Sequence, residues 1–294
     1  MKNYFLKENH DTIPFLKEAS IKSDYVLITV NAHSEMGMIS GEANVGNFIS
    51  YCVKQKLFSK IIWIKEDKNI DIEDGFYEFS IFWDRKLSEW KCNFEHFYCF
   101  FEDSFAIKND YDNEKHPYEA TALDERIKNP INVQLEVISE KNLAKSRFAG
   151  LNWVLSIDCS FFSAANPFKA ELTKTINRIG KTRAIELKER ILKIKAYNQW
   201  DDFKKRMIAS EEWPNARELI DYSYTETDYS DKEIDKKILN ILTFLKKNFP
   251  REKCLQTLTC ISFFSGYTLK KNCPAIVSSI GAVFENFDFF WEMA

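Results

Sequence analysis

Short apolar runs and amphipathic stretches alternate along the chain, and this alternation is the first guide to its fold. Runs of β-branched and aromatic residues that lack polar alternation are typical of strands buried in a parallel sheet. They predict strands at residues 3–7, 25–30, 60–65, 131–138, 153–158 and 255–262, with two more inside 76–101 around a turn near 84–91. Apolar residues at helical spacing predict helices over 10–19, 47–56, 168–209, 231–247 and 274–286. The polar stretch 108–130 is predicted to be rich in loops.

The order of these elements indicates an α/β protein. Because strands and helices alternate, we expect a three-layer, doubly wound, mostly parallel sheet with helices on both faces. No internal repeat or flexible linker interrupts the chain, so we predict a single domain over residues 1–294, with a charged helical segment at about 168–250. Charges of both signs at helical spacing in that segment are typical of a solvated helix.

Composition and charge argue against several classes of protein. The 294 residues are 45% hydrophobic, which is enough to form a sizeable core. The net charge of −3 gives no sign of a nucleic-acid partner. No apolar run reaches the roughly 18–20 residues that span a bilayer, and the polar start rules against a signal peptide, so we expect a cytoplasmic protein with no membrane partner. Seven cysteines without a CxxC pair indicate reduced thiols.

Polar residues able to bind a metal follow three of the predicted strands. Ligands of open α/β sheets bind beyond the carboxyl ends of the strands, which makes the ends of strands 3–7, 25–30 and 153–158 the places to look. The candidate metal ligands there are His10, Asn31, His33, Glu35, Asp158 and Ser160. Each has an ordinary alternative as a cap, a turn residue or one side of an extended segment. The hypothesis of a metal site therefore depends on all three strand ends together.

Five motifs of the chain carry a family resemblance. The motifs are ENHDTIPFLKEA, VNAHSEMG, NVGNFISYCVKQKLFSKIIWI, LSIDCSFFS and ISFFSGYT. In this order they resemble the ureohydrolase-like family that contains the peptide arginases, and they cover nearly the whole chain. The resemblance implies the arginase/deacetylase α/β fold with a metal centre at the strand ends. It also implies hydrolysis of peptidyl arginine to ornithine and urea, in which two Mn²⁺ ions share carboxylates and activate water.

The family's metal ligands map onto this chain with departures. The resemblance puts His10 at the first histidine position, Asn31, His33 and Glu35 at an Asp-x-His-x-Asp segment, and Asp158 and Ser160 at an Asp-x-Asp segment. Asn31 and Ser160 replace carboxylates, so four carboxylates become two. Two carboxylates neutralise one divalent ion and not two. Three outcomes stay open, namely a single Mn²⁺, a single Zn²⁺ or Fe²⁺, and a site without metal.

Two residues near the second motif are candidates for binding substrate. Arginases steady the guanidinium group with a carboxylate, and the segment ISFFSGYT contains none. Glu42 is the nearest acidic residue by sequence, although a solvated loop glutamate or a helix-capping group is the more common explanation for such a residue. Asn47 either contacts substrate or caps the helix that follows it. No single residue is assigned as the catalytic group.

Two functions follow from these observations. The first is a metal-dependent hydrolase of C–N bonds that acts on a peptide or a small guanidinium compound, with one metal or weakened activity. The second is a catalytically inactive arginase-fold protein that serves as a binding or regulatory module. The aromatic segment FENFDFFWEMA (284–294) is expected to pack on the body or on another subunit, which would make a homo-oligomer.

Overall fold

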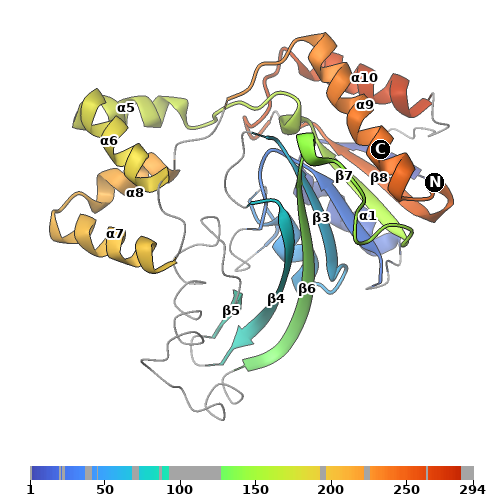
Figure 1. Cartoon of the computed structure of the whole chain (residues 1–294), viewed down its shortest axis with the longest axis horizontal. Helices are drawn as coiled ribbons and strands as arrows, with labels where there is room; N and C mark the ends of the chain where they lie inside the picture. The colour runs from blue at the N-terminus through green and yellow to red at the C-terminus, as the bar shows by residue number, and fades with distance from the viewer. Residues whose placement is uncertain are drawn as a thin grey trace. The chain divides into compact units, whose positions relative to one another are not determined.

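Figure 1 shows the fold in the computed structural model of the chain. The structure describes residues 2–19, 21, 24–36, 42–44, 46–67, 73–85, 88–92, 127–192, 197–221, 226–262 and 264–285. The segment HFYCFF, most of the polar stretch 108–130 and most of the aromatic segment 284–294 lie outside these residues. The chain divides into two compact units, one formed by residues 1–164 and 227–294 and the other by residues 165–226. Each unit is described by itself.

The first unit is built on one mostly parallel sheet, as the sequence predicted. In the described residues its eight strands are β1 (Lys2–Leu6), β2 (Val26–Val30), β3 (Lys60–Lys65), β4 (Gly75–Asp84), β5 (Glu89–Cys92), β6 (Ile127–Ser139), β7 (Trp153–Asp158) and β8 (Cys254–Cys260). Their order across the sheet is β1-β8-β7-β2-β3-β6-β4-β5. All neighbours from β1 to β6 pair in parallel, whereas β4 is antiparallel to both β6 and β5.

Both faces of the sheet are covered, in agreement with three layers. The described α-helices of this unit are α1 (Ile13–Glu18), α2 (Phe48–Lys54), α9 (Asp231–Asn248) and α10 (Cys273–Glu285). The unit also has the short 3-10 helices η1 (Asn9–Thr12), η2 (Glu140–Asn142), η3 (Cys159–Phe161) and η4 (Arg251–Lys253). Val26 and Ile28 on β2 pack into one core with α9 and α10, which lie together on one side of the sheet in Figure 1. The alternate residue Leu27 points the other way and is also fully buried.

The longest helix of the first unit shows why these residues form a helix. Ser230 and Glu233 make a capping box at the start of α9, in which the Ser230 amide donates to Glu233 Oε2 at 2.8 Å. Ile234, Ile238 and Ile241 then recur at helical spacing and are buried against the sheet. The helix therefore follows from local capping together with one apolar stripe.

The second unit is helical and has its own core. It contains α5 (Lys169–Ile179), α6 (Lys181–Leu192), α7 (Tyr197–Ala209) and α8 (Trp213–Asp221), and lies within the charged segment that the sequence predicted to be helical. Leu187, Phe203 and Leu219 belong to a buried cluster that is separate from the core of the sheet. Arg178 and Arg183 form ion pairs with acids of the same unit.

None of the helices in the described ranges is both long enough and apolar enough to cross a membrane.

Candidate functional site

Six buried polar residues meet at the carboxyl ends of β2, β7 and β8, beside the turn that follows β1. They are Asn9, Asn31, Glu35, Asp158, Ser160 and Ser262. Parallel pairing brings these strand ends together, because β7 lies between β2 and β8. We call this set the strand-end cluster. It contains four of the predicted metal-ligand positions and two residues that the sequence did not single out.

The two carboxylates of the cluster are joined by an amide. Asn9 donates from Nδ2 to Glu35 Oε1 and to Asp158 Oδ2. Asn31 donates from Nδ2 to the same oxygen of Glu35. Asn31 therefore faces the site, and its amide group donates a hydrogen bond to a carboxylate.

Asp158 is held by the backbone and by a serine as well as by Asn9. The Ser160 amide donates to Asp158 Oδ1 at 2.7 Å, so Asp158 caps η3. The Ser262 hydroxyl donates to Asp158 Oδ2 at 2.6 Å. Ser160 Oγ in turn donates to Asn31 Oδ1 at 3.3 Å. The capping role and the role in the cluster are compatible, since each uses a different oxygen.

Glu35 has the most unusual surroundings of the cluster. Its backbone φ is 48°, in the left-handed region that few non-glycine residues occupy. Its Oε2 atom is buried and has no hydrogen-bond partner among the described residues. Burial raises the pKa of Glu35 well above its usual range, and the Asp158 carboxylate raises it further, while hydrogen bonds from Asn31 and Asn9 oppose the shift. A buried carboxylate with a spare oxygen favours binding either a cation or a proton.

A third acid, Glu8, lies at the same edge of the sheet. Its two oxygens accept hydrogen bonds from the amide and the hydroxyl of Ser265, each at 2.8 Å. Burial raises the pKa of Glu8, and the Asp158 carboxylate adds to this effect, against the hydrogen bonds from Ser265. Glu8 thus ties the turn after β1 to the segment after β8. The sequence predicted no acidic residue beside ISFFSGYT. Glu8 lies there in the structure although it comes from the other end of the chain.

The two predicted histidine ligands lie at different places around the cluster. The His10 side chain is 35% exposed, and its Nε2 lies 3.8 Å from Asp11 Oδ1. Asn9 hydrogen-bonds to both carboxylates of the cluster, whereas the His10 Nδ1 atom is buried without a hydrogen-bond partner among the described residues. The His33 amide donates to Asn31 Oδ1 at 3.0 Å, and its ring meets the Tyr267 ring edge to face at 5.3 Å.

The predicted substrate-binding residues belong to the loop before α2. Asn47 is buried, accepts a hydrogen bond from the Asn44 amide at 2.8 Å and donates to the Glu42 carbonyl at 3.1 Å. Its side chain shapes this loop and does not cap α2. Glu42 is exposed. The loop reaches the strand-end cluster through α2, where the Ile49 amide donates to the Glu35 carbonyl at 3.0 Å.

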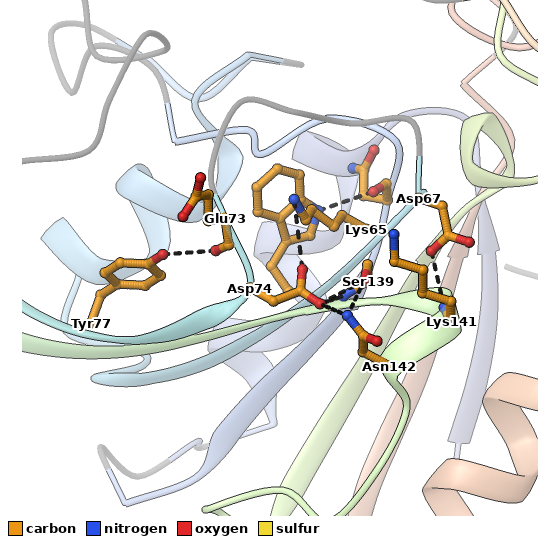
Figure 2. Close-up of polar contacts among 10 residues, drawn as sticks. Lys65, Asp67, Glu73, Asp74, Tyr77, Ser139, Lys141 and Asn142 are labelled. Carbon is orange, nitrogen blue, oxygen red and sulfur yellow. Dashed lines mark hydrogen bonds and ion pairs between the residues drawn. The ribbon is translucent and has the colours of Figure 1, made fainter. Parts of the chain in front are cut away.

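A second set of charged residues lies further along the same edge, where β3 and β6 end (Figure 2). Asp74, just before β4, accepts hydrogen bonds from Ser139 Oγ at 2.5 Å, the Ser139 amide at 3.0 Å and Asn142 Nδ2 at 2.6 Å, and pairs with Lys65 at 3.7 Å. Burial favours a higher pKa for Asp74, but the hydrogen bonds from Asn142 and Ser139 outweigh it and lower the pKa. Asp74 therefore fastens the start of β4 to the end of β6.

Comparisons with known proteins give no indication of the function. No protein-family model matches the chain, and no curated protein matches it significantly. Within the described residues, no group of three or more His, Cys, Asp and Glu side chains is arranged to hold a metal ion. The cluster offers two carboxylates together with amide and hydroxyl oxygens.

Proposed function

We propose that the chain is an arginase-fold hydrolase that uses one divalent cation to break a C–N bond of a guanidinium group, in a peptide or a small molecule. The observation that carries the proposal is the meeting of Glu35 and Asp158, from distant parts of the chain, in a buried site at the strand ends. Carboxylates are rarely buried unless they are paired or bind a cation. In the described residues, neither acid forms an ion pair with lysine or arginine.

The donor set fits one divalent ion. Two carboxylates match the charge of one such ion, whereas two ions would keep an excess of two positive charges in a buried site. Glu35 Oε2 is a buried oxygen without a hydrogen-bond partner among the described residues, so it can become a ligand at no cost in hydrogen bonds. Asn31 and Ser160 add neutral oxygens, which suits Mn²⁺. Zn²⁺ and Fe²⁺ are the alternatives if His10 and His33, proposed from the resemblance, also bind.

The chain's own residues would prepare the reaction in three ways. Asp158 is oriented by Ser160 and Ser262, so it needs little reorganisation to bind. Because Glu35 and Asp158 would balance the charge of the cation, the third acid at this edge, Glu8, would supply the negative charge that attracts a cationic guanidinium group. A bound divalent cation would supply Lewis acidity and lower the pKa of water. Glu42 and Asn47 stay the proposed substrate contacts, and we propose that the enzyme works in the cytoplasm.

Metal content is the direct test of this proposal. Protein purified without chelator and loaded with Mn²⁺ is expected to hold one ion per chain by elemental analysis and to gain thermal stability by mass action. Asp158→Asn and Glu35→Gln should lose both effects. Glu136→Gln is a matched control, because Glu136 is also buried and hydrogen-bonded, to Ser146 at 2.5 Å, outside the cluster. Loaded protein should release urea from arginine-containing peptides, and urea release that survives removal of all metal would contradict the proposal.

A second candidate function is a binding module that works without metal. The observation in its favour is that the amide groups of Asn9 and Asn31 already donate to the two carboxylates. In this case no stoichiometric metal survives dialysis, and Mn²⁺, Zn²⁺ and Fe²⁺ leave the melting temperature unchanged. Converting Asn31→Asp and Ser160→Asp together should then create metal binding, because the positions of the ligands are kept while their charges are restored.

A further inference from the structure

A buried lysine, Lys237, lies at the centre of a third group of polar residues, distinct from the strand-end cluster and from the set around Asp74. Lys237 on α9 is 9% exposed. Its ammonium group forms an ion pair with Glu140 and lies 3.7 Å from Glu66 Oε1. It also lies 4.9 Å from the centre of the Phe161 ring and 4.4 Å from that of the Tyr229 ring. The charge is thus surrounded by two carboxylates and two aromatic rings.

Burying these three charged groups costs more free energy than burying an apolar side chain that fills the same space. Removing an ammonium group and two carboxylates from water costs free energy that their attraction only partly returns. Apolar side chains of similar volume often replace such buried sets with no loss of stability. The burial of Lys237 therefore calls for a role that depends on its position and charge.

The partners of Lys237 follow the ends of three strands, of which β3 and β6 are neighbours and β7 is separated from β3 by β2. Glu66 directly follows β3, Glu140 begins η2 after β6, and Phe161 ends η3 after β7. The first two ends are fastened to their neighbours: Lys65 pairs with Asp74, and the Lys141 amide donates to Asp67 at 3.0 Å (Figure 2). Lys237 links η3 to this fixed part of the sheet edge.

η3 is the part of the strand-end cluster that this link reaches. Asp158 caps η3 and Ser160 lies inside it, so both residues move with the short helix that Phe161 completes. The amides of Phe162 and Ser163 donate to the Cys159 carbonyl at 3.0 and 3.2 Å, which makes the turn one compact piece. A shift of the Phe161 ring would therefore displace Asp158 and Ser160 together.

We propose that Lys237 is a positioning residue of the strand-end cluster. Its ammonium group holds the Phe161 ring against the ends of β3 and β6 and thereby sets the orientation of Asp158 and Ser160. The metal-affinity part of its test rests on the proposed function. The local effect on η3 does not, because it is defined in the protein without any cation.

The first measurement is hydrogen exchange of the amides in residues 158–163 of the full-length protein, without metal. Lys237→Met removes the charge and keeps most of the volume, and is expected to speed exchange at Ser160, Phe162 and Ser163 by at least about tenfold through local opening. Lys237→Arg keeps the positive charge and can still contact the aromatic rings, so it should restore exchange to within about threefold of the unchanged protein. Lys236→Met, at an exposed position of the same helix, is the matched control and should change nothing.

The second measurement is the dissociation constant for Mn²⁺ in the same variants. We expect it to rise about tenfold in Lys237→Met, as is typical for loss of a group that orients metal ligands, and to recover in Lys237→Arg. If the unchanged protein binds no Mn²⁺, the proposed function fails while the exchange result still decides the role of Lys237. Protection of residues 158–163 that stays unchanged in Lys237→Met would overturn the inference.

Global destabilisation is the outcome that must be told apart from a local effect. Removing Lys237 alone takes the positive charge away from the Glu66 and Glu140 carboxylates, which lowers stability on its own. The double variant Lys237→Met with Glu140→Gln removes the ammonium group and one carboxylate together and limits this loss. If exchange then rises equally along β7, α9 and η3, Lys237 is merely structural and the inference is wrong. Faster exchange confined to η3 supports it.

Discussion

Glu35 is the residue whose protonation the strand-end cluster controls most strongly. It is buried, lies close to Asp158 and has an oxygen without a hydrogen-bond partner among the described residues. Asn9 and Asn31 both donate to its other oxygen, which partly offsets the burial of its charge. The same features that make ionised Glu35 costly without a cation make it a strong ligand with one.

The first prediction concerns the pH dependence of stability in metal-free protein. The pKa of Glu35 is raised in the folded state from a reference value of 4.5, so its protonated form favours folding. The contribution is fully present below the unfolded pKa and is lost as pH rises through the folded pKa. Glu35→Gln should remove this dependence and stabilise the metal-free protein at pH 7 by roughly 1–3 kcal/mol. Urea unfolding with chelator at several pH values measures it, and equal slopes in both proteins would contradict it.

The second prediction separates Asn9 from its neighbour His10. Asn9→Ala should destabilise metal-free protein by about 1–3 kcal/mol, because two buried carboxylates lose a shared donor. His10→Ala is the control and should change stability by less than about 0.5 kcal/mol, as is usual for partly exposed side chains. Chemical unfolding checks both values. A larger loss in His10→Ala than in Asn9→Ala would mean that the roles are reversed.

At the scale of elements, charged residues fasten the antiparallel part of the sheet to the parallel part. Asp74 joins the start of β4 to the end of β6 through Ser139 and Asn142. These contacts lie where the strand direction changes, because β6 is parallel to β3 and antiparallel to β4. The ends of β3 and β6 are thereby held in register, and β3 lies next to β2, one of the strands that end at the strand-end cluster.

The third prediction is that Asp74→Asn lowers the free energy of unfolding by about 1–2 kcal/mol through weaker hydrogen bonds and loss of the Lys65 pair. The folded pKa of Asp74 is lowered from 3.8, so its contribution is present above that value and is lost as pH falls through the folded pKa. The variant should therefore lose less stability than the unchanged protein on acidification below about pH 4. Ser80→Ala removes an exposed hydrogen bond between β4 and β6 and serves as control. A similar loss in both variants would contradict the assignment.

At the scale of the whole molecule, the helical unit is an insertion with closely spaced ends. The chain leaves the first unit after Ala164 and returns at Thr227. The Thr227 amide donates to the Ala164 carbonyl at 2.9 Å, and the Ala164 amide donates to Thr227 Oγ1 at 3.0 Å. Each unit has its own buried core. Among the described residues, the core cluster of the sheet contains none from 165–226.

The fourth prediction follows from the closeness of Ala164 and Thr227, between which the helical unit is inserted. Replacing residues 165–226 by a short glycine-serine linker should leave a folded, monodisperse protein, because the linker closes only a small gap. Its melting temperature should stay within several degrees of the parent value, and any Mn²⁺-induced shift should persist. Circular dichroism and calorimetry measure both properties. A molten or aggregated product would mean that the sheet requires the helical unit.

The sequence by itself determined the elements of the sheet. The predicted strands 25–30, 60–65 and 153–158 match β2, β3 and β7 within one residue, because a continuous apolar run is a local property of a strand buried on both faces. Four of the six predicted metal-ligand positions also meet, since parallel strands bring their carboxyl ends to one edge.

Only the tertiary structure decided which side chains enter the site. Asn9 and His10 are adjacent, and residue type favours the histidine as a ligand, but the direction of each side chain depends on the η1 turn. Glu8 meets Ser265 because β1 pairs with β8, a contact between the two ends of the chain. The reversal of β4 and the burial of Lys237 likewise depend on pairing and packing between distant segments. The spacing of apolar residues indicates which side chains are buried, but it does not indicate which distant segments pack together.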